Sequence, residues 1–163
     1  MKLHVRSRGF SLIELLVVVA VLLTLMAIAI PNLMRARGTA NEASAVASLR
    51  AISTGQASYQ QTYGVGYAPS LLALGPTGGG APTAAAADLI DQVLASGTKT
   101  GYNFFYNPVD SNGDARMDTY TIQANPIVPG QTGSKYFFTD ESNVIRFSLL
   151  GPATVASQPI PPQ

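Results

Sequence analysis

The chain contains no cysteine and no tryptophan, and its only histidine is His4. The lack of cysteine excludes disulfides, cysteine–zinc sites and cysteine nucleophiles. Charged residues make up only 12% of the 163 residues and hydrophobic residues 47%, which excludes a disordered polyelectrolyte. The formal net charge of +1 gives no bulk electrostatic sign of a nucleic-acid binder. The length suits one small domain with an appendage.

One long apolar run near the N-terminus determines the topology. Residues 10–30 contain a single charged residue, Glu14. As an α-helix, this run would span about 30 Å, which is the thickness of the hydrocarbon core of a bilayer. Basic residues flank the run, three before it and two after it: Lys2, Arg6, Arg8, Arg35 and Arg37. This small difference favours a cytoplasmic N-terminus.

Three interpretations of the apolar run are open. The first is a secretory signal peptide that is cut after Ala29, because Ala27 and Ala29 match a small-x-small cleavage site. The second is a plain single-span anchor. The third is a short basic leader, residues 1–9, that is removed before the apolar run. Glu14 inside the run and Pro31 just beyond it weigh against the signal peptide.

The sequence around Gly9 favours the third interpretation. Residues 9–18 are GFSLIELLVV, and residues 29–32 are AIPN. These residues resemble the prepilin cleavage and methylation motif that type IV pilins share with the pseudopilins of type II secretion. The resemblance implies that an inner-membrane prepilin peptidase cuts between Gly9 and Phe10 and methylates the new α-amine of Phe10. It also implies a homopolymer whose growth needs an assembly ATPase and a platform protein.

Glu14 has two compatible roles. Ser11 and Glu14 have the spacing of a capping box, in which an acidic side chain stabilises the positive N-terminal end of a helix. A carboxylate among apolar residues is costly at membrane depth unless a cation compensates it, and the run contains none. After cleavage, the α-amine of Phe10 in a neighbouring subunit would supply that cation. We therefore expect Phe10, Glu14 and Pro31 to act in assembly.

The helical pattern continues beyond the apolar run and becomes amphipathic. Apolar side chains recur at three- and four-residue spacing with Gln56 in one gap, at Val46, Leu49, Ile52, Tyr59 and Tyr63. The opposite face carries Arg50, Thr54, Ser58 and Gln61. A helix over 11–63 would be about 80 Å long, more than a domain of this size can bury. Pro31 and Gly38 interrupt the pattern, and Thr39 with Glu42 resembles a second capping box. We therefore consider one continuous helix, or a helix with a flexible stretch over 31–38.

The remaining residues predict a small antiparallel sheet. Residues 64–101 are expected to be a linker with short helices, one that follows a turn within 67–74 and one capped by Asp88. Three or four strands are expected within 102–150, followed by an irregular proline-rich tail over 151–163. With a leader over 1–9, a filament-core helix over 10–30 and an amphipathic half over 31–63, the fold class is α+β and pilin-like. One face of the sheet should pack on residues 46–63.

A loop rich in oxygen ligands raises the question of calcium. Asp110, Asn112 and Asp114 alternate, with Asp118 nearby. Calcium takes six to eight such oxygens. Ala115 occupies the glycine position of an EF-hand loop, and Thr121 occupies its glutamate position. The same residues predict a hairpin turn around Asn112 and Gly113. Both interpretations stay open, and no other cofactor is expected.

The residue inventory favours a structural protein over an enzyme. A mature chain without histidine and cysteine cannot carry the usual triads, and no phosphate-binding glycine loop follows a strand. Nucleic-acid binding is expected at most as a secondary activity, because the basic residues Lys99, Arg116, Lys135 and Arg146 are scattered. We expect a filament subunit, first in the inner membrane and later in an extracellular pilus or a periplasmic pseudopilus. A major pseudopilin is the alternative.

Overall fold

The computed structural model describes residues 10–161. The predicted leader, with the cleavage residue Gly9, lies outside the described residues. The chain divides into two compact units with the boundary between Ala36 and Arg37, and each unit is described by itself. Helix α1, Leu12–Tyr63, contributes to both units. We call its residues 12–36 the apolar half and its residues 37–63 the packed half.

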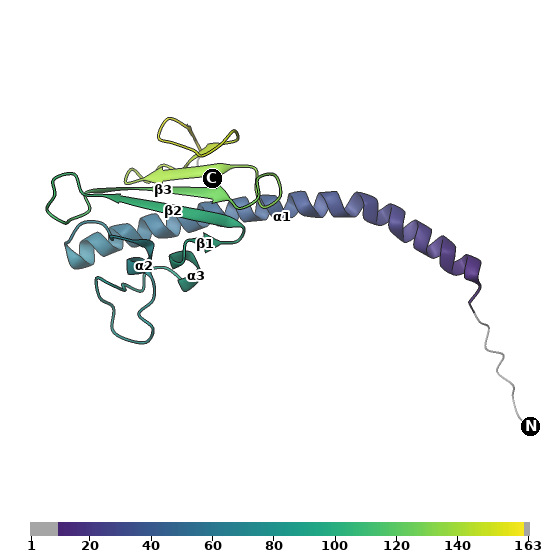
Figure 1. Cartoon of the computed structure of the whole chain (residues 1–163), viewed down its shortest axis with the longest axis horizontal. Coiled ribbons are helices and arrows are strands. Elements are labelled where there is room, and N and C mark those ends of the chain that lie inside the picture. The colour runs from purple at the N-terminus through teal and green to yellow at the C-terminus, as the bar shows by residue number, and fades with distance from the viewer. Residues whose placement is uncertain (1–9, 162–163) are drawn as a thin grey trace, which may run out of the picture. The chain divides into compact units, whose positions relative to one another are not determined.

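Helix α1 begins one residue after Ser11 and continues through Pro31 and Gly38 to Tyr63 (Figure 1). The continuous interpretation is therefore confirmed. The second capping box, with Thr39 as the cap, is wrong: Thr39 lies inside the helix and begins none. The carboxylate of Glu42 instead accepts a hydrogen bond from the backbone N–H of Ser134 at 2.8 Å.

The second unit contains a six-stranded antiparallel sheet whose strands follow one another in chain order. The strands are β1 Thr98–Lys99, β2 Tyr102–Val109, β3 Thr119–Pro126, β4 Tyr136–Asp140, β5 Arg146–Ser148 and β6 Gln158–Pro159. The four central strands correspond to the predicted ones. The sheet is wider than predicted, because it also includes β1 and β6 outside 102–150. These strands contain two residues each, too few for a period of two to be detected. They lie in the expected linker and tail.

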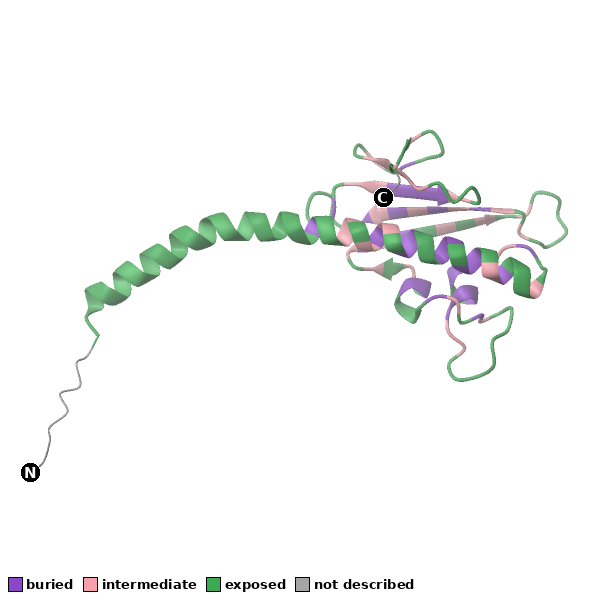
Figure 2. Cartoon of the chain, turned by 180° about the vertical axis from the view of Figure 1, so that it is seen from behind, coloured by how far each residue is buried: buried purple, intermediate pink, exposed green. Residues whose placement is uncertain are grey.

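The packed half of α1 lies against this sheet and supplies one side of the core (Figure 2). Leu49, Ile52, Gln56 and Tyr59 are at most 1% exposed. Their partners on the sheet are buried side chains of alternate residues: Tyr102, Phe104, Tyr120, Ile122, Ala124 and Phe137. The predicted helix face is confirmed in its centre, whereas Val46 and Tyr63 at its margins are only partly buried. Ser58, placed on the solvent face, is half-buried.

Two four-residue helices cover the core next to the packed half: α2, Leu71–Leu74, and α3, Gln92–Ala95. Gly55 faces this layer, and a Cβ there would lie in van der Waals contact with the Ile90 side chain between α2 and α3, at 3.4 Å. Helix α2 lies within the predicted segment 67–74, and the Ser70 side chain caps it by accepting the N–H of Ala73. The cap of the second helix was wrong: Asp91 accepts the hydrogen bond from the N–H of Leu94, and Asp88 adopts a positive φ of 54° before the helix.

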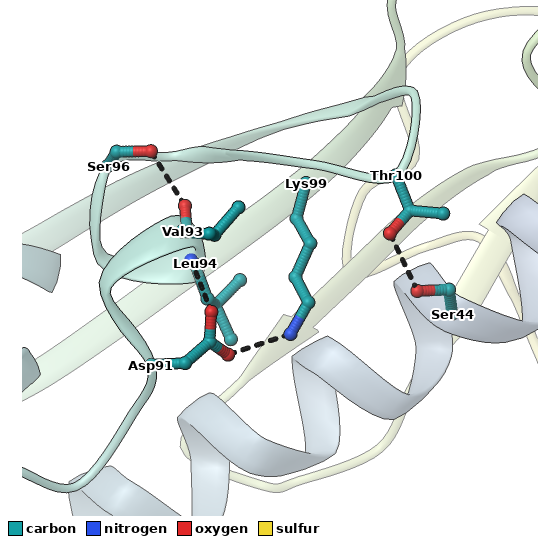
Figure 3. A network of polar contacts seen from close by, with 7 residues as sticks. All are labelled: Ser44, Asp91, Val93, Leu94, Ser96, Lys99 and Thr100. Atoms are coloured by element: carbon teal, nitrogen blue, oxygen red, sulfur yellow. Dashed lines mark hydrogen bonds and ion pairs between the residues drawn. The ribbon is translucent and has the colours of Figure 1, made fainter.

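A small polar network fastens this layer to α1 (Figure 3). Asp91 also forms an ion pair of 2.7 Å with Lys99 on β1. The hydrogen bond from Lys99 holds the pKa of Asp91 below its ordinary value, and the N–H of Leu94 acts in the same direction. On the next residue, the Thr100 hydroxyl accepts a hydrogen bond of 3.1 Å from Ser44 on α1. The network thus joins α3, β1 and the start of the packed half.

The β3–β4 loop holds the start of the packed half from another direction. Asn41 donates to the carbonyl of Thr132 at 2.9 Å, and Glu42 forms an ion pair of 3.1 Å with Lys135. Gly133 is required here, because a Cβ at this position would lie 2.1 Å from the hydroxyl oxygen of Tyr102. The globular unit therefore holds α1 firmly from about Asn41 onward.

Candidate assembly surface

The apolar half of α1 exposes large hydrophobic side chains on every side. Leu15, Leu25 and Ile28 are 60–69% exposed, and Val19 is still 44% exposed. None of the most apolar window of α1 is buried, and the helix is long and apolar enough to cross a membrane by length and composition. Soluble proteins rarely expose apolar patches larger than a few hundred Å². This surface therefore requires lipid or other protein chains around it.

Glu14 is the only charged residue in the first two-thirds of this surface, and the structure shows how it is held. Its Oε2 accepts a hydrogen bond of 2.9 Å from the backbone N–H of Ser11. The backbone carbonyl of Ser11 accepts the N–H of Leu15 at 3.2 Å. This is one half of the predicted capping box, with the acid at the positive end of the helix dipole. Phe10, 86% exposed, directly precedes this turn.

Pro31 lies within the helix between the two regions that the sequence distinguishes. It has no N–H to donate to the helix ladder. The boundary between the compact units lies after Ala36, nine residues before the buried Ala45, and within the stretch proposed to be flexible. Pro31 is exposed, and Gly38 is the first buried residue of α1. Flexibility over 31–38 stays a prediction.

The four residues considered for calcium lie together in the β2–β3 loop. Their side-chain oxygens accept hydrogen bonds from backbone N–H groups of the same loop. Asp110 accepts N–H groups from Gly113 at 2.7 Å and Ala115 at 2.9 Å, and Asp118 accepts the N–H of Ser111 at 2.9 Å. The hydrogen bond from Gly113 is the main reason that the pKa of Asp110 lies below its ordinary value.

The same pattern extends to the other two residues of this loop. Asn112 accepts the N–H of Asp114, and Asp114 accepts the N–H of Arg116. Within the described residues, no three acidic, histidine or cysteine side chains converge as metal ligands would. These oxygens therefore fit the turn interpretation better than calcium coordination. Calcium binding stays a prediction of the sequence.

The basic residues considered for nucleic-acid binding do not form a common patch. Lys99 pairs with Asp91, and Lys135 pairs with Glu42. Arg116 belongs to the acidic β2–β3 loop, and Arg146 donates to the carbonyl of Ser157 at 3.2 Å. An array of these residues across a polymer would be needed to bind a phosphate backbone.

Sequence reasoning missed a groove beside the packed half of α1. It holds about 380 Å³ and lies between α1, the β4–β5 pair and the last described residues. Val46, Phe137 and Phe147 line it, and Arg50 and Lys135 border it. The one signal for this groove in the sequence was Arg50, which lies among smaller polar residues on the predicted solvent face of the helix. Its neighbours in the groove come from strands almost a hundred residues later, and no local pattern could place them.

The comparisons with known proteins agree at the N-terminal segment. Residues 5–30 match the family model of the prokaryotic N-terminal methylation motif. The chain is 44% identical over 54 residues to the type IV major pilin protein PilA of Myxococcus xanthus. The match covers 33% of this chain and only 24% of that relative. No solved structure matches the chain significantly. The resemblance to the type IV pilin and pseudopilin family is thus confirmed for the N-terminal segment.

Proposed function

We propose that this chain, which carries the methylation motif of type IV pilin-like proteins, is the structural subunit of a type IV pilus-like filament. Its precursor is a single-pass protein of the inner membrane. Prepilin peptidase cuts between Gly9 and Phe10 and methylates the amine of Phe10. The processed chain then polymerises through the apolar half of α1, with an assembly ATPase and a platform protein as partners. This proposal includes no catalytic step by the chain itself.

The observation that carries the proposal is the contrast between an exposed apolar helix and the single acid at its start. Burying such side chains yields about 25 cal/mol for each Å² removed from water. Lipid supplies this burial in the membrane, and equivalent helices of other copies supply it in a filament. The transfer from membrane to polymer therefore costs little apolar burial. Length and composition alone would suit a signal sequence equally well, so the motif is needed to distinguish the two.

Glu14 gives the polymer its register in this proposal. Its Oε2 holds the N–H of Ser11, whereas no donor among the described residues bonds its second carboxylate oxygen, Oε1. The methylated amine of Phe10 in a neighbouring copy would be the cation that pairs with this oxygen. An unpaired carboxylate at membrane depth costs a few kcal/mol, so a copy that docks out of register is disfavoured.

The first experiment is the mass of the N-terminal peptide of the protein isolated from its own cells. A chain that begins at Phe10 with one added methyl group supports prepilin processing. A chain that begins at Ile30 would make the apolar run a signal peptide and contradict the proposal. An intact Met1 would make the run a plain anchor and would also contradict it.

A major pseudopilin of type II secretion is the second candidate. The N-terminal motif does not separate it from a pilin, but the matched curated relative is a major pilin, which favours the pilus. Deletion of the chain distinguishes the two. Loss of long surface filaments supports the pilin, whereas retention of exoproteins in the periplasm without loss of filaments supports the pseudopilin.

A further inference from the structure

The groove beside α1 carries a cation for which its own chain provides no partner. Arg50 is exposed at its border, and the described residues offer it neither an ion pair nor a hydrogen bond. Lys135, at the other side, is paired with Glu42 and lies 5.9 Å from the ring of Phe147. Phe137 at the floor is 2% exposed, and Val46 and Phe147 are half-buried. The groove thus combines an apolar floor with one unsatisfied positive charge.

The opposite charge lies at the other end of the same unit. Tyr67, four residues after α1 ends, donates to the carbonyl of Met117, so the β2–β3 loop lies at the end of the unit where α1 ends. Lys135, by contrast, contacts Glu42 at the end where the packed half begins. The β2–β3 loop contains Asp110, Asp114 and Asp118 and a single cation. In Figure 1 this loop projects beyond the sheet.

The loop is also preorganised for a contact. Hydrogen bonds from Gly113 and Ala115 to Asp110 fix its backbone. Asp114 is exposed, and each of its carboxylate oxygens accepts only one hydrogen bond within the chain. A carboxylate oxygen has about two acceptor sites, so Asp114 can accept a guanidinium from outside. A rigid loop loses little conformational entropy on docking.

We propose that the groove receives the β2–β3 loop of a second copy of this chain, with Arg50 of one copy paired to Asp114 of the next. Charge complementarity selects this occupant: two grooves facing each other would oppose two Arg50 side chains. A contact between different surfaces of identical chains does not close as a two-fold dimer, and it generates an open helical polymer when its rotation does not close into a ring. The inference rests on the proposed function, because so small a contact is too weak to hold two free copies together.

Cross-linking tests this contact directly, because the chain has no native cysteine. The double variant Arg50→Cys/Asp114→Cys is co-expressed with the unsubstituted chain, so that filaments form whatever the variant does. Sheared filaments are oxidised or treated with a short bismaleimide. We expect a ladder of dimers and longer oligomers on a denaturing gel. The matched controls are the two single-cysteine variants, which should stay monomeric.

The outcomes separate this inference from the proposed function. Filaments without a ladder from the double variant would overturn the contact and leave the filament role intact. Dimers from Arg50→Cys alone would show groove facing groove and would also overturn it. If the unsubstituted chain forms no filament at all, the proposed function fails and the inference with it.

A charge exchange gives a second test that does not depend on cross-linking chemistry. Arg50→Glu or Asp114→Lys alone should lower the filament yield by about fivefold to tenfold at low salt, as expected for a contact between partly solvated charges. The combination in one chain should restore the yield. Arg116→Glu is the matched control, because it reverses a charge in the same loop but places no positive charge against Arg50. Equal losses in the single variants and the combination would contradict the pairing.

Discussion

The two halves of α1 share one helix and have opposite surroundings. Leu25 in the apolar half is 60% exposed, whereas Leu49 in the packed half is 0% exposed. The apolar half presents leucine, isoleucine and valine around its whole circumference. The packed half buries only the residues that recur at helical spacing. Both halves are helical, so secondary structure alone does not show which half is buried within a single copy of the chain.

The difference comes from small residues and from what is available to cover each half. Ala45, Ser48 and Gly55 let the sheet and the short helices approach the packed half closely. Residues 10–161 provide no second apolar layer for residues 12–36, so we propose that their burial comes from lipid or other copies. One half thus stabilises the fold of a single copy, and we propose that the other stabilises the polymer.

Replacement of Glu14 by leucine should have the largest effect. Because the register of the polymer depends on its carboxylate in our proposal, Glu14→Leu should lower the filament yield by at least about tenfold. Sheared filaments are measured against total chain in the membrane. Glu14→Asp is the matched control, since it keeps the charge and should retain part of the yield. Normal filaments from Glu14→Leu would contradict the register role.

Two leucine replacements compare the halves of α1 directly. Leu49→Ala should lower the free energy of unfolding by about 2–5 kcal/mol, because it leaves a cavity in the core. Leu25→Ala should change it by less than about 0.5 kcal/mol, because that side chain is 60% exposed. The near-UV circular dichroism of the tyrosines in detergent follows the unfolding of the globular unit. A similar loss from both variants would show that the two halves are not independent.

Much of this architecture follows from local pattern. The apolar run, the capping box at Ser11 and the four central strands all depend on neighbours within a few residues, and the sequence predicts them. Asp91 instead of Asp88 caps α3, and the reason is not local: Asp91 also pairs with Lys99, which lies on β1. Glu42 likewise resembles a cap in the sequence but bonds to Ser134 and Lys135. Sequence pattern cannot include such distant partners.

The candidate site divides in the same way. Phe10, Glu14 and Pro31 lie in a continuous segment whose chemistry is visible in the sequence alone. The groove at Arg50 is built from α1 and from strands β4 and β5, so it exists only after folding. The acidic β2–β3 loop was visible in the sequence, but its alternating oxygens left both a hairpin turn and a calcium site open. Only the folded loop shows that backbone N–H groups take them.

Hydrogen exchange can locate the junction between the halves. We expect amides of residues 31–38 to exchange at least about tenfold faster than those of 46–63, because Pro31 removes a helix hydrogen bond and the globular unit begins only at Arg37, whereas residues 46–63 include the buried Leu49 and Ile52. The measurement is exchange with mass spectrometry on the detergent-solubilised chain. Residues 15–25 serve as an internal reference for helix without tertiary contacts. Equal protection over 31–38 and 46–63 would sink the flexible junction.

Addition or removal of calcium should have the smallest effect on stability. The experiment tests whether the globular unit needs a bound ion to be stable. Both oxygens of Asp110 and one oxygen of Asp118 already accept backbone N–H groups, which hold the loop without an ion. We therefore expect excess calcium or EDTA to change the melting temperature by less than about 1 °C, whereas calcium binding by the native state alone would raise it with concentration. A rise of several degrees would restore the calcium interpretation.

Asp110→Ala separates the two sources of loop stability. It removes the acceptor for Gly113 and Ala115, so it should lower the melting temperature at neutral pH with or without calcium. The folded pKa of Asp110 lies below its ordinary value of about 4. Its contribution is therefore present above that ordinary value and is lost as the pH falls through the lowered pKa. The difference between variant and native chain should vanish in acid; a difference that appears only with calcium would instead assign the loop to the metal.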